Sequence, residues 1–406
     1  LKAGKMLKSA VDLGYKGALS AIIDSNVTTF VTGLILFWFG SGPIKGFATT
    51  LMIGIATSLF TAIFISRLVI SWRLDRNKDI TFWTNWSKNL FSNTNIDFMG
   101  KRKMFYVISF VLIAISIGSM ATKGFNWGVD FTGGRTYVAE FDNAVDVDQV
   151  RSAMEPVVKT EAGRQYTMNV KTYGGDKRLK ITTNYLIEDP ILGSDSIVQA
   201  RISDGLAKVG PFHFADETRK VDPTISDDIV KGAITSVLIS LVFMFIYIAI
   251  RFKNWQYGAG ALLSLMHDTI IVLGLYSLLW GIVGFSLEID EAFIAVILTV
   301  IGYSINDTVV VFDRIREYLT DHKREGVVQV FNKAMNLTLS RTLMTGLNVM
   351  IVLLIIFFMG SAAIKGFVFG LFVGIVVGTY SSIFVASAVA VDFLKRKEEK
   401  QVALAA

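Results

Sequence analysis

The chain has 406 residues, of which 52% are hydrophobic and only 18% are charged, and its mean hydropathy is +0.51. This composition excludes an ordinary soluble globular domain and indicates a protein embedded in a membrane. The formal net charge is +6. The basic residues lie mostly in loops between apolar runs, so they mark a membrane surface, and no nucleic-acid partner is expected. The chain has no cysteine, which is compatible with an oxidising exterior.

Apolar runs of about 20 residues recur along the chain, and each is long enough to cross a hydrocarbon core roughly 30 Å thick. They predict eight transmembrane helices, so the lipid bilayer is the first expected partner. In chain order, the predicted spans are 19–39, 47–70, 104–121, 231–250, 257–280, 292–312, 340–359 and 366–391.

Basic residues are unevenly distributed between the two sides of these spans. They occur in the N-terminal segment, in 71–103, at Arg251 and Lys253, in 313–339 and in the tail, whereas the turn 281–291 has none. Because basic loops remain in the cytoplasm, we expect both ends of this chain to be cytoplasmic and residues 122–228 to be extracytoplasmic. The predicted location is the cytoplasmic (inner) membrane.

The predicted spans divide the chain into six parts. These are a two-span part (1–70), a polar cytoplasmic linker (71–103) that contains Trp83 and Trp86, a single span (104–121), the extracytoplasmic segment (122–228), a five-span region (229–392) and a cytoplasmic tail (393–406). The chain opens at Leu1 and not at a methionine, so we expect it to be a fragment of a longer polypeptide.

The extracytoplasmic segment has the pattern of a small α+β domain. Strands are predicted at 136–141, 166–173, 178–183 and near 217–221, and helices at 146–155 and 195–208. Gly174-Gly175-Asp176 is typical of the turn of a hairpin between the second and third strands. The order βαββαβ is that of the ferredoxin-like motif.

A short internal repeat links the two membrane parts. Ile44-Lys45-Gly46-Phe47 recurs as Ile364-Lys365-Gly366-Phe367, and small residues follow at every fourth position in both copies. Small residues on one helix face allow backbones to approach closely, which ordinary helix packing also explains. The match between copies predicts two pseudo-equivalent halves, as in many transporters. Residues 24–29 align with 340–345 if a few residues are inserted later in the second copy.

Three ionisable residues lie inside or at the edge of predicted spans, where charge is costly. Asp24 and Asp307 lie roughly 8 Å deep by the helical rise, and Arg341 lies at the inner end of its span. A nearby arginine lowers the pKa of an aspartate while burial raises it, so a site where both act can change protonation. Together the three residues predict a proton relay. A static buried ion pair, or snorkelling to the interface, explains the same positions.

Polar neighbours of the two acids are candidates to support such a relay. Asn26 and Thr28 flank Asp24, and Asn306 precedes Asp307. Asp268, beside His267, falls near the middle of the fifth span, where it either extends the relay or serves as a structural link to another helix.

Signatures of catalysis are absent from the sequence. It contains no Walker motif, no cysteine, and only three histidines at separate positions, so neither a metal centre nor a Ser-His-Asp arrangement is predicted. The stretch from Asn126 to Gly134 is rich in glycine but lacks GxGxxG, and we interpret it as the structural connection into the outer domain. The sequence therefore predicts a transport protein, not an enzyme, with no cofactor.

Several longer stretches resemble the SecD–SecF protein-export membrane proteins of the resistance–nodulation–division (RND) superfamily. IIDSNVTT (22–29) and GPIKGF (42–47) resemble the end of SecD. Residues 95–392 resemble SecF. The stretches that carry this resemblance are WGVDFTGG (127–134), VDPTISDDIVKGA (221–233), HD (267–268), GYSINDTVVVFDRIRE (302–317) and LSRTLMT (339–345). The resemblance implies a chain that joins the last two SecD helices to a complete SecF, with the larger upstream SecD part missing.

The resemblance also implies a function. It predicts an accessory subunit of the Sec translocase that uses the proton-motive force to promote preprotein export and release. The expected partners are the Sec translocon channel with its associated subunits, unfolded preprotein and the missing SecD half. The family's relay residues correspond here to Asp24, Asp307 and Arg341. Sodium in place of protons is an open alternative for the coupling ion. Two other functions stay open, namely an RND-type exporter of small hydrophobic molecules and a non-transporting translocon scaffold.

Overall fold

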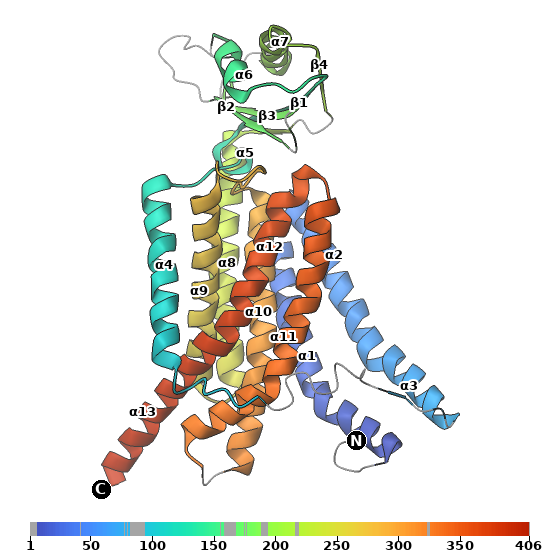
Figure 1. Cartoon of the computed structure of the whole chain (residues 1–406), viewed down its shortest axis with the longest axis vertical. Coiled ribbons are helices and arrows are strands. Elements are labelled where there is room, and N and C mark those ends of the chain that lie inside the picture. The colour runs from blue at the N-terminus through green and yellow to red at the C-terminus, as the bar shows by residue number, and fades with distance from the viewer. Residues whose placement is uncertain are drawn as a thin grey trace.

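The computed structural model describes residues 6–40, 42–76, 78, 80–81, 94–154, 156–157, 168–173, 175, 177–187, 194–215, 219–322 and 325–405. A helical bundle forms the body, and a small sheet domain stands on one end of it (Figure 1). We call this end of the bundle the domain end and the opposite end, near which both chain termini lie, the basic end. The predicted linker residues Trp83 and Trp86, and Gly174 and Asp176 of the predicted turn, lie outside the described residues.

Within the described residues, eight helical stretches are long and apolar enough to cross a membrane. They are α1 (Leu7–Phe39), α2 (Gly42–Phe60) continued by η1 (Thr61–Ile65) and α3 (Ser66–Asp75), α4 (Arg102–Lys123), α8 (Pro223–Arg251), α9 (Trp255–Leu279), α10 (Glu291–Asp321), α11 (Val327–Met359), and α12 (Ala362–Ser381) continued by η2 (Ser382–Ala386) and α13 (Ser387–Ala405). All eight predicted spans are confirmed. Several helices continue beyond the span at the basic end, because no proline interrupts them there.

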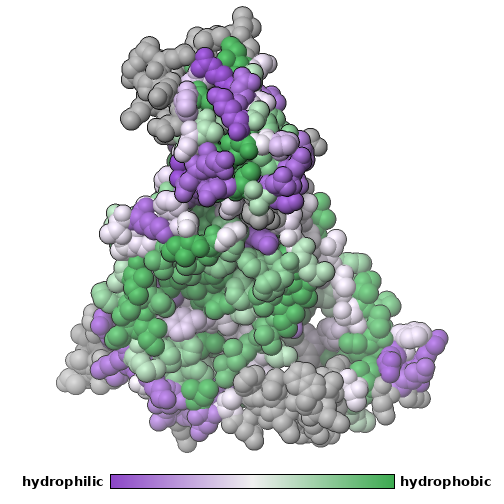
Figure 2. Space-filling model, turned by 45° about the horizontal axis from the view of Figure 1, so that its top comes forward, coloured by the Kyte–Doolittle hydropathy of each residue, from purple (hydrophilic) through white to green (hydrophobic). Residues whose placement is uncertain are grey.

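Helix α10 is the centre of the bundle. In the most apolar 18-residue stretch of α10, 83% of the residues are buried. In the most apolar 18-residue stretch of the helix formed by α2, η1 and α3, none is buried. α10 packs against α1, α9, α11 and α12, and these neighbours cover most of its surface. Figure 2 shows a broad hydrophobic zone over the bundle, with hydrophilic residues on the domain and at the far end. This surface fits a multi-pass membrane protein.

The internal repeat is visible in the geometry of the helices. α1 and α11 each have 33 residues, and each ends at a glycine, Gly40 or Gly360, with the same extended backbone. Phe47 and Phe367 of the repeated motif contact each other with ring centroids 6.0 Å apart. The two π-helical turns, η1 and η2, also occupy matching places, and a serine, Ser66 or Ser387, bonds the carbonyl five residues earlier in each.

This equivalence corrects one prediction. The alignment of 24–29 with 340–345 required inserted residues, but α1 and α11 are uninterrupted helices of equal length. The offset between copies is therefore 320 residues throughout these helices. Arg341 corresponds to Ala21, and Asp24 corresponds to Met344. The acid of one half and the base of the other lie about one helical turn apart in the repeat.

The small domain has the predicted ferredoxin-like order. Its elements are β1 (Gly134–Phe141), α6 (Val147–Met154), β2 (Met168–Thr172), β3 (Arg178–Thr183), α7 (Ser194–Ala207), β4 (Phe212–Phe214) and β5 (Arg219–Val221). The sheet order is β2-β3-β1-β4, β5 also pairs with β1, and all pairs are antiparallel. The last strand was predicted as one short piece near 217–221, but it starts earlier and is divided into β4 and β5.

The domain core lies between the sheet and its two helices, which cover the face turned away from the bundle (Figure 1). Tyr137, Leu179 and Ile181 of the sheet pack there with Val150 and Ile202 of the helices. Alternation along β1 and β3 turns their other residues, such as Val138 and Lys180, toward the bundle.

The stretch 126–134 is the predicted connection into this domain, and it contains the short helix α5 (Val129–Thr132). Gly133 and Gly134 have φ values of 68° and 139°, a region that side chains rarely adopt. A Cβ atom on Gly134 would lie 2.8 Å from the carbonyl oxygen of Thr183. Two glycines are thus required where the chain turns tightly into β1.

Candidate functional site

Asp24 lies on α1 and is buried, with 9% of its surface exposed. The Arg251 guanidinium donates two hydrogen bonds to its Oδ2 atom, from Nε at 2.8 Å and from Nη2 at 2.5 Å. The hydroxyl of Tyr247 donates to Oδ1 at 3.1 Å, and that of Ser20 to Oδ2 at 3.3 Å. Asp24 is therefore a carboxylate with its counter-charge in place.

Arg251, the last residue of α8, was interpreted from the sequence only as a marker of the cytoplasmic side. Its guanidinium also lies 3.9 Å from the carboxylate of Asp313 on α10, so it connects three helices. The sequence does contain a signal for this pairing. Arg251 ends an apolar span on the same side of the membrane as Asp24, and Tyr247 lies one turn earlier on the same helix. The guanidinium that pairs with Asp24 is thus Arg251 and not Arg341.

Asp307 on α10 has a different environment. It is 5% exposed, and its Oδ1 atom accepts a long hydrogen bond of 3.4 Å from Thr345 on α11. Its Oδ2 atom is buried without a partner among the described residues, and so are the hydroxyls of Tyr303 and Thr342. Buried polar atoms without partners are uncommon in proteins and mark places with a special role or with bound water. Asp307 therefore lies in an incompletely satisfied polar cluster.

The two acids lie at the same level of the bundle. α1 and α10 run in opposite directions, and the hydroxyl of Thr29 donates to the carbonyl oxygen of Gly302 at 3.3 Å. Asp24 and Asp307 each lie five residues nearer the basic end than this contact, or about 7.5 Å along the axis. Along the bundle axis the two aspartates thus lie at the same level, on two helices that pack directly against each other.

Arg341 is exposed, and within the described part of the chain it makes no ion pair within 4 Å. It lies on α11, one turn nearer the basic end than Thr345, which contacts Asp307. A long arginine side chain can cover such an offset. The structure therefore brings Arg341 to the neighbourhood of Asp307 but does not pair them.

The predicted supporting residues behave differently from one another. Asn26 and Thr28 donate to carbonyl oxygens of their own helix, at 2.8 Å each, and neither bonds Asp24. Asn306 is half-buried and has no side-chain hydrogen bond to any described residue. None of these contacts connects the two acids.

Asp268 on α9 joins three helices. Its Oδ2 atom accepts hydrogen bonds from Ser304 on α10 at 2.7 Å and from Ser381 on α12 at 2.8 Å. Nδ1 of His267 lies 3.0 Å from Oδ1. With 1% of its surface exposed, Asp268 is fully hydrogen-bonded, which favours the structural link over the relay.

The fold and this site define a class of protein: a multi-pass membrane protein with repeated halves and acidic residues between them. The sequence profile described as protein export membrane protein SecD/SecF, C-terminal, matches residues 2–76 and 202–396. The profile of the SecD/SecF GG motif matches residues 118–145. The chain belongs to the SecD/SecF family of protein-export membrane proteins.

Individual relatives agree with this assignment. The chain is 42% identical over 309 residues to protein translocase subunit SecF of Rhodothermus marinus, which covers 76% of this chain and 96% of that protein. It is 31% identical to protein translocase subunit SecDF of Thermus thermophilus, over 100% of this chain and 52% of the relative. The chain thus spans nearly the whole of the first relative and about half of the second.

Solved structures show the same fold. The crystal structure of SecDF, a translocon-associated membrane protein from Thermus thermophilus, has a TM-score of 0.82 at 30% identity and covers 97% of this chain and 51% of that one. SecDF in its super-membrane-facing form has a TM-score of 0.73, also at 30% identity, and covers 99% of this chain and 52% of that one.

Proposed function

We propose that this chain acts as an accessory subunit of the Sec protein translocase and uses the proton-motive force to promote preprotein export and release. The observation that carries the proposal is the pair of acids at one depth on facing helices of the two repeat halves. Asp24 forms an ion pair with a guanidinium, and one carboxylate oxygen of Asp307 has no hydrogen-bond partner among the described residues. Ionisable groups in this setting are typical of proton pathways.

In this proposal, protons reach the two acids from one side of the membrane and leave toward the other. Protonation of Asp307 changes the attraction between α10 and Arg341 on α11, which lies one turn away. Protonation of Asp24 weakens its bonds to Arg251. Either event changes the packing of α10 against its neighbours, and the small domain, which stands above α10, moves with it.

The proposed orientation places the basic end in the cytoplasm and the small domain outside. Arg251, Arg314 and Arg316 lie at the basic end, as the distribution of charge in membrane proteins requires for a cytoplasmic face. The chain has no cysteine, so single introduced cysteines report orientation directly by their accessibility to an impermeant thiol reagent in sealed vesicles.

The test is proton flux in vesicles that contain the protein and an imposed pH gradient. Asp24→Asn and Asp307→Asn should reduce flux to that of protein-free vesicles and abolish gradient-driven stimulation of export. Asp321→Asn is the matched control, because it removes the same charge at an exposed position of α10 and should behave as wild type. Wild-type flux in Asp307→Asn would exclude the relay. Flux that follows a sodium gradient instead would replace the proton as coupling ion.

The same assay separates the scaffold alternative from the proposed function. A scaffold that only tethers the translocon predicts wild-type export in Asp307→Asn and Arg341→Lys. An exporter of small hydrophobic molecules requires an apolar pocket near the domain. A cavity of about 520 Å³ there is lined by the charged side chains of Asp130, Lys180, Glu288 and Asp290 and by apolar ones such as Phe293 and Phe367. Its lining does not separate this alternative from the proposed function, so resistance assays with wild type and Asp307→Asn are the discriminating measurement.

A further inference from the structure

Two segments at the domain end run side by side and connect the small domain to α10. The first is 126–130, before β1, and the second is 286–291, which leads into α10. The amide of Ile289 donates to the carbonyl of Asn126 at 2.8 Å, and the amide of Gly128 donates to the carbonyl of Ile289 at 2.9 Å. A Cβ atom on Gly128 would lie 2.9 Å from the Cβ atom of Asp290, so glycine permits this close approach.

The first turn of α10 is capped from both segments. Asp290 accepts from the amide of Phe293 at 2.9 Å, which is an ordinary N-cap within the helix's own segment. Asp130 accepts from the amide of Glu291 at 3.1 Å, although it belongs to the other segment. Asp130 is 5% exposed. A helix start has amides without intrahelical partners, and here one of them is bonded by a residue of the domain connection.

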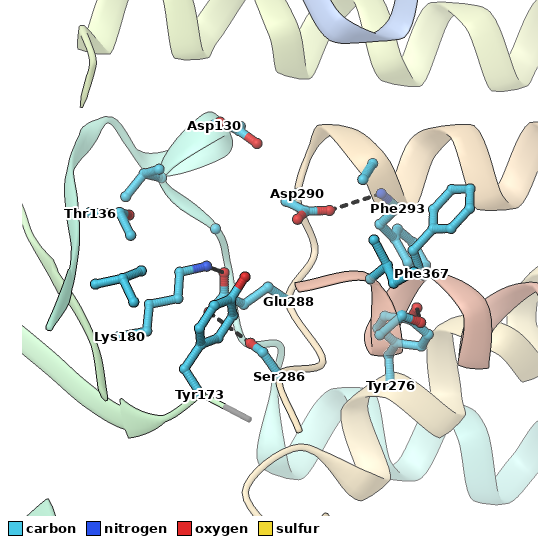
Figure 3. Close-up of a pocket in the computed structure, with 16 residues that line it drawn as sticks. Asp130, Thr136, Tyr173, Lys180, Tyr276, Ser286, Glu288, Asp290, Phe293 and Phe367 are labelled. Atoms are coloured by element: carbon cyan, nitrogen blue, oxygen red, sulfur yellow. Dashed lines mark hydrogen bonds and ion pairs between the residues drawn. The ribbon is translucent and has the colours of Figure 1, made fainter. Parts of the chain in front are cut away.

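The sheet is attached to the same two segments. Lys180 of β3 forms an ion pair with Glu288 at 2.5 Å, and Lys171 of β2 donates to the side-chain oxygen of Asn126. Burial alone would raise the pKa of Glu288, but the Lys180 ammonium outweighs this effect and holds the pKa below its usual range. Figure 3 shows the Lys180–Glu288 pair on the sheet side of the cavity and Asp290 at the start of the helix.

We infer that segments 126–130 and 286–291 form a clamp that transmits displacement of α10 to the small domain, with Asp130 as the residue that positions the first turn of α10. The inference rests on the proposed function for the origin of the displacement. α10 is continuous from Glu291 to Asp307, which is about 24 Å of helix. A shift or rotation at the acid therefore reaches the clamp without an intervening hinge. The cavity beside the clamp leaves space for the sheet to move.

The test combines a distance measurement with the ratio of export to proton flux. Spin labels on cysteines introduced at Ile197 of α7 and Met359 of α11, both exposed, report the position of the domain relative to the bundle in the whole protein in lipid. Asp130→Ala should broaden this distance distribution and reduce export per transported proton at least tenfold, while proton flux stays within twofold of wild type. Asp130→Asn keeps an acceptor oxygen and should restore both quantities.

Lys180→Met is the second variant, because it leaves the cap of α10 intact and removes the ion pair between the sheet and Glu288, while the Lys171–Asn126 bond remains. It should broaden the distribution as Asp130→Ala does, which keeps the test decisive if Asp130→Ala fails to fold. An unchanged distribution with unchanged coupling would overturn the clamp. So would equal losses of flux and export that Asp130→Asn does not rescue, because they indicate a static structural role. If the wild type carries no proton flux, the proposed function fails, and the distance distributions still decide whether the clamp holds the domain.

Discussion

Replacement of Arg251 by methionine tests the ion pair that sequence reasoning missed. Methionine keeps most of the length and the apolar contacts of the side chain but removes the guanidinium. From the described residues, Oδ2 of Asp24 then retains the bond from Ser20 at 3.3 Å, and Oδ1 retains the bond from Tyr247 at 3.1 Å. The carboxylate remains buried between α1 and α8 without a cation.

The expected cost follows from the burial of both partners. Removal of one member of a fully buried ion pair destabilises a protein by about 3–5 kcal/mol. The side chains of Arg251 and Asp24 are 21% and 12% exposed, so water reaches the pair in part, and we expect about 2–3 kcal/mol for Arg251→Met. The double variant with Asp24→Asn carries no unpaired charge and should recover about 2 kcal/mol relative to the sum of the single effects.

Equilibrium unfolding in bicelles, followed by tryptophan fluorescence, measures these free energies. The four proteins form a double-mutant cycle: the wild type, Arg251→Met, Asp24→Asn and the double variant. Arg251→Lys is the control for charge, since it keeps a cation and loses the two-bond geometry, and it should cost less than Arg251→Met. Single effects that add to within about 0.5 kcal/mol would refute the pairing.

Two further predictions concern the connection between the domain and the bundle. Gly134→Ala should destabilise the protein by about 3 kcal/mol, because alanine there has an unfavourable φ and its Cβ meets the carbonyl oxygen of Thr183. Gly124→Ala has an unfavourable backbone (φ 69°, ψ −157°) but open space around it, so it should cost less, about 1–2 kcal/mol, in the same unfolding assay. Burial, together with neighbouring acids, raises the pKa of Asp290 from 3.8 to about 6. A carboxyl with a raised pKa in the folded state stabilises the fold below pH 4, and this contribution is lost as the pH rises through 6. The thermal unfolding midpoint should therefore fall between pH 4 and pH 6.5, and Asp290→Asn, which keeps the cap, should remove this component; an identical pH profile in the variant would contradict the assignment.

The membrane fold was accessible from the sequence because lipid imposes a simple requirement. A span must be about 20 apolar residues long, so composition alone located all eight. Composition does not predict how far such a helix extends beyond the hydrocarbon core into water. α11 begins at Val327, well before the predicted 340, because nothing between them interrupts the hydrogen-bonded backbone.

For the site, only the depth of each residue along the bundle axis could be predicted from the sequence. Counting residues from the end of a span gives depth, and it correctly placed Asp24 and Asp307 at one level. Counting does not give the position of a residue around the bundle axis. Arg251 and Arg341 both lie near the basic end, and only the packing of α8 against α1 decides that Arg251 contacts Asp24. The mistaken repeat alignment has the same origin, since a match of six residues cannot fix the register of a helix with 33.

The difference between the two acids bears on the order of events in the proposed relay. Asp24 is bonded to a guanidinium, so a proton that binds there neutralises the carboxylate and weakens its ion pair with Arg251. Oδ2 of Asp307 has no partner in the part of the chain that the structure describes, so a proton can bind there without breaking an ion pair seen in the structure. Arg251 lies 3.9 Å from Asp313 on α10, the helix that also carries Asp307. A small movement of α10 after protonation of Asp307 therefore changes the distance between Arg251 and its second acid. In the proposed relay, protonation of Asp307 would therefore change the strength of the ion pair between Arg251 and Asp24.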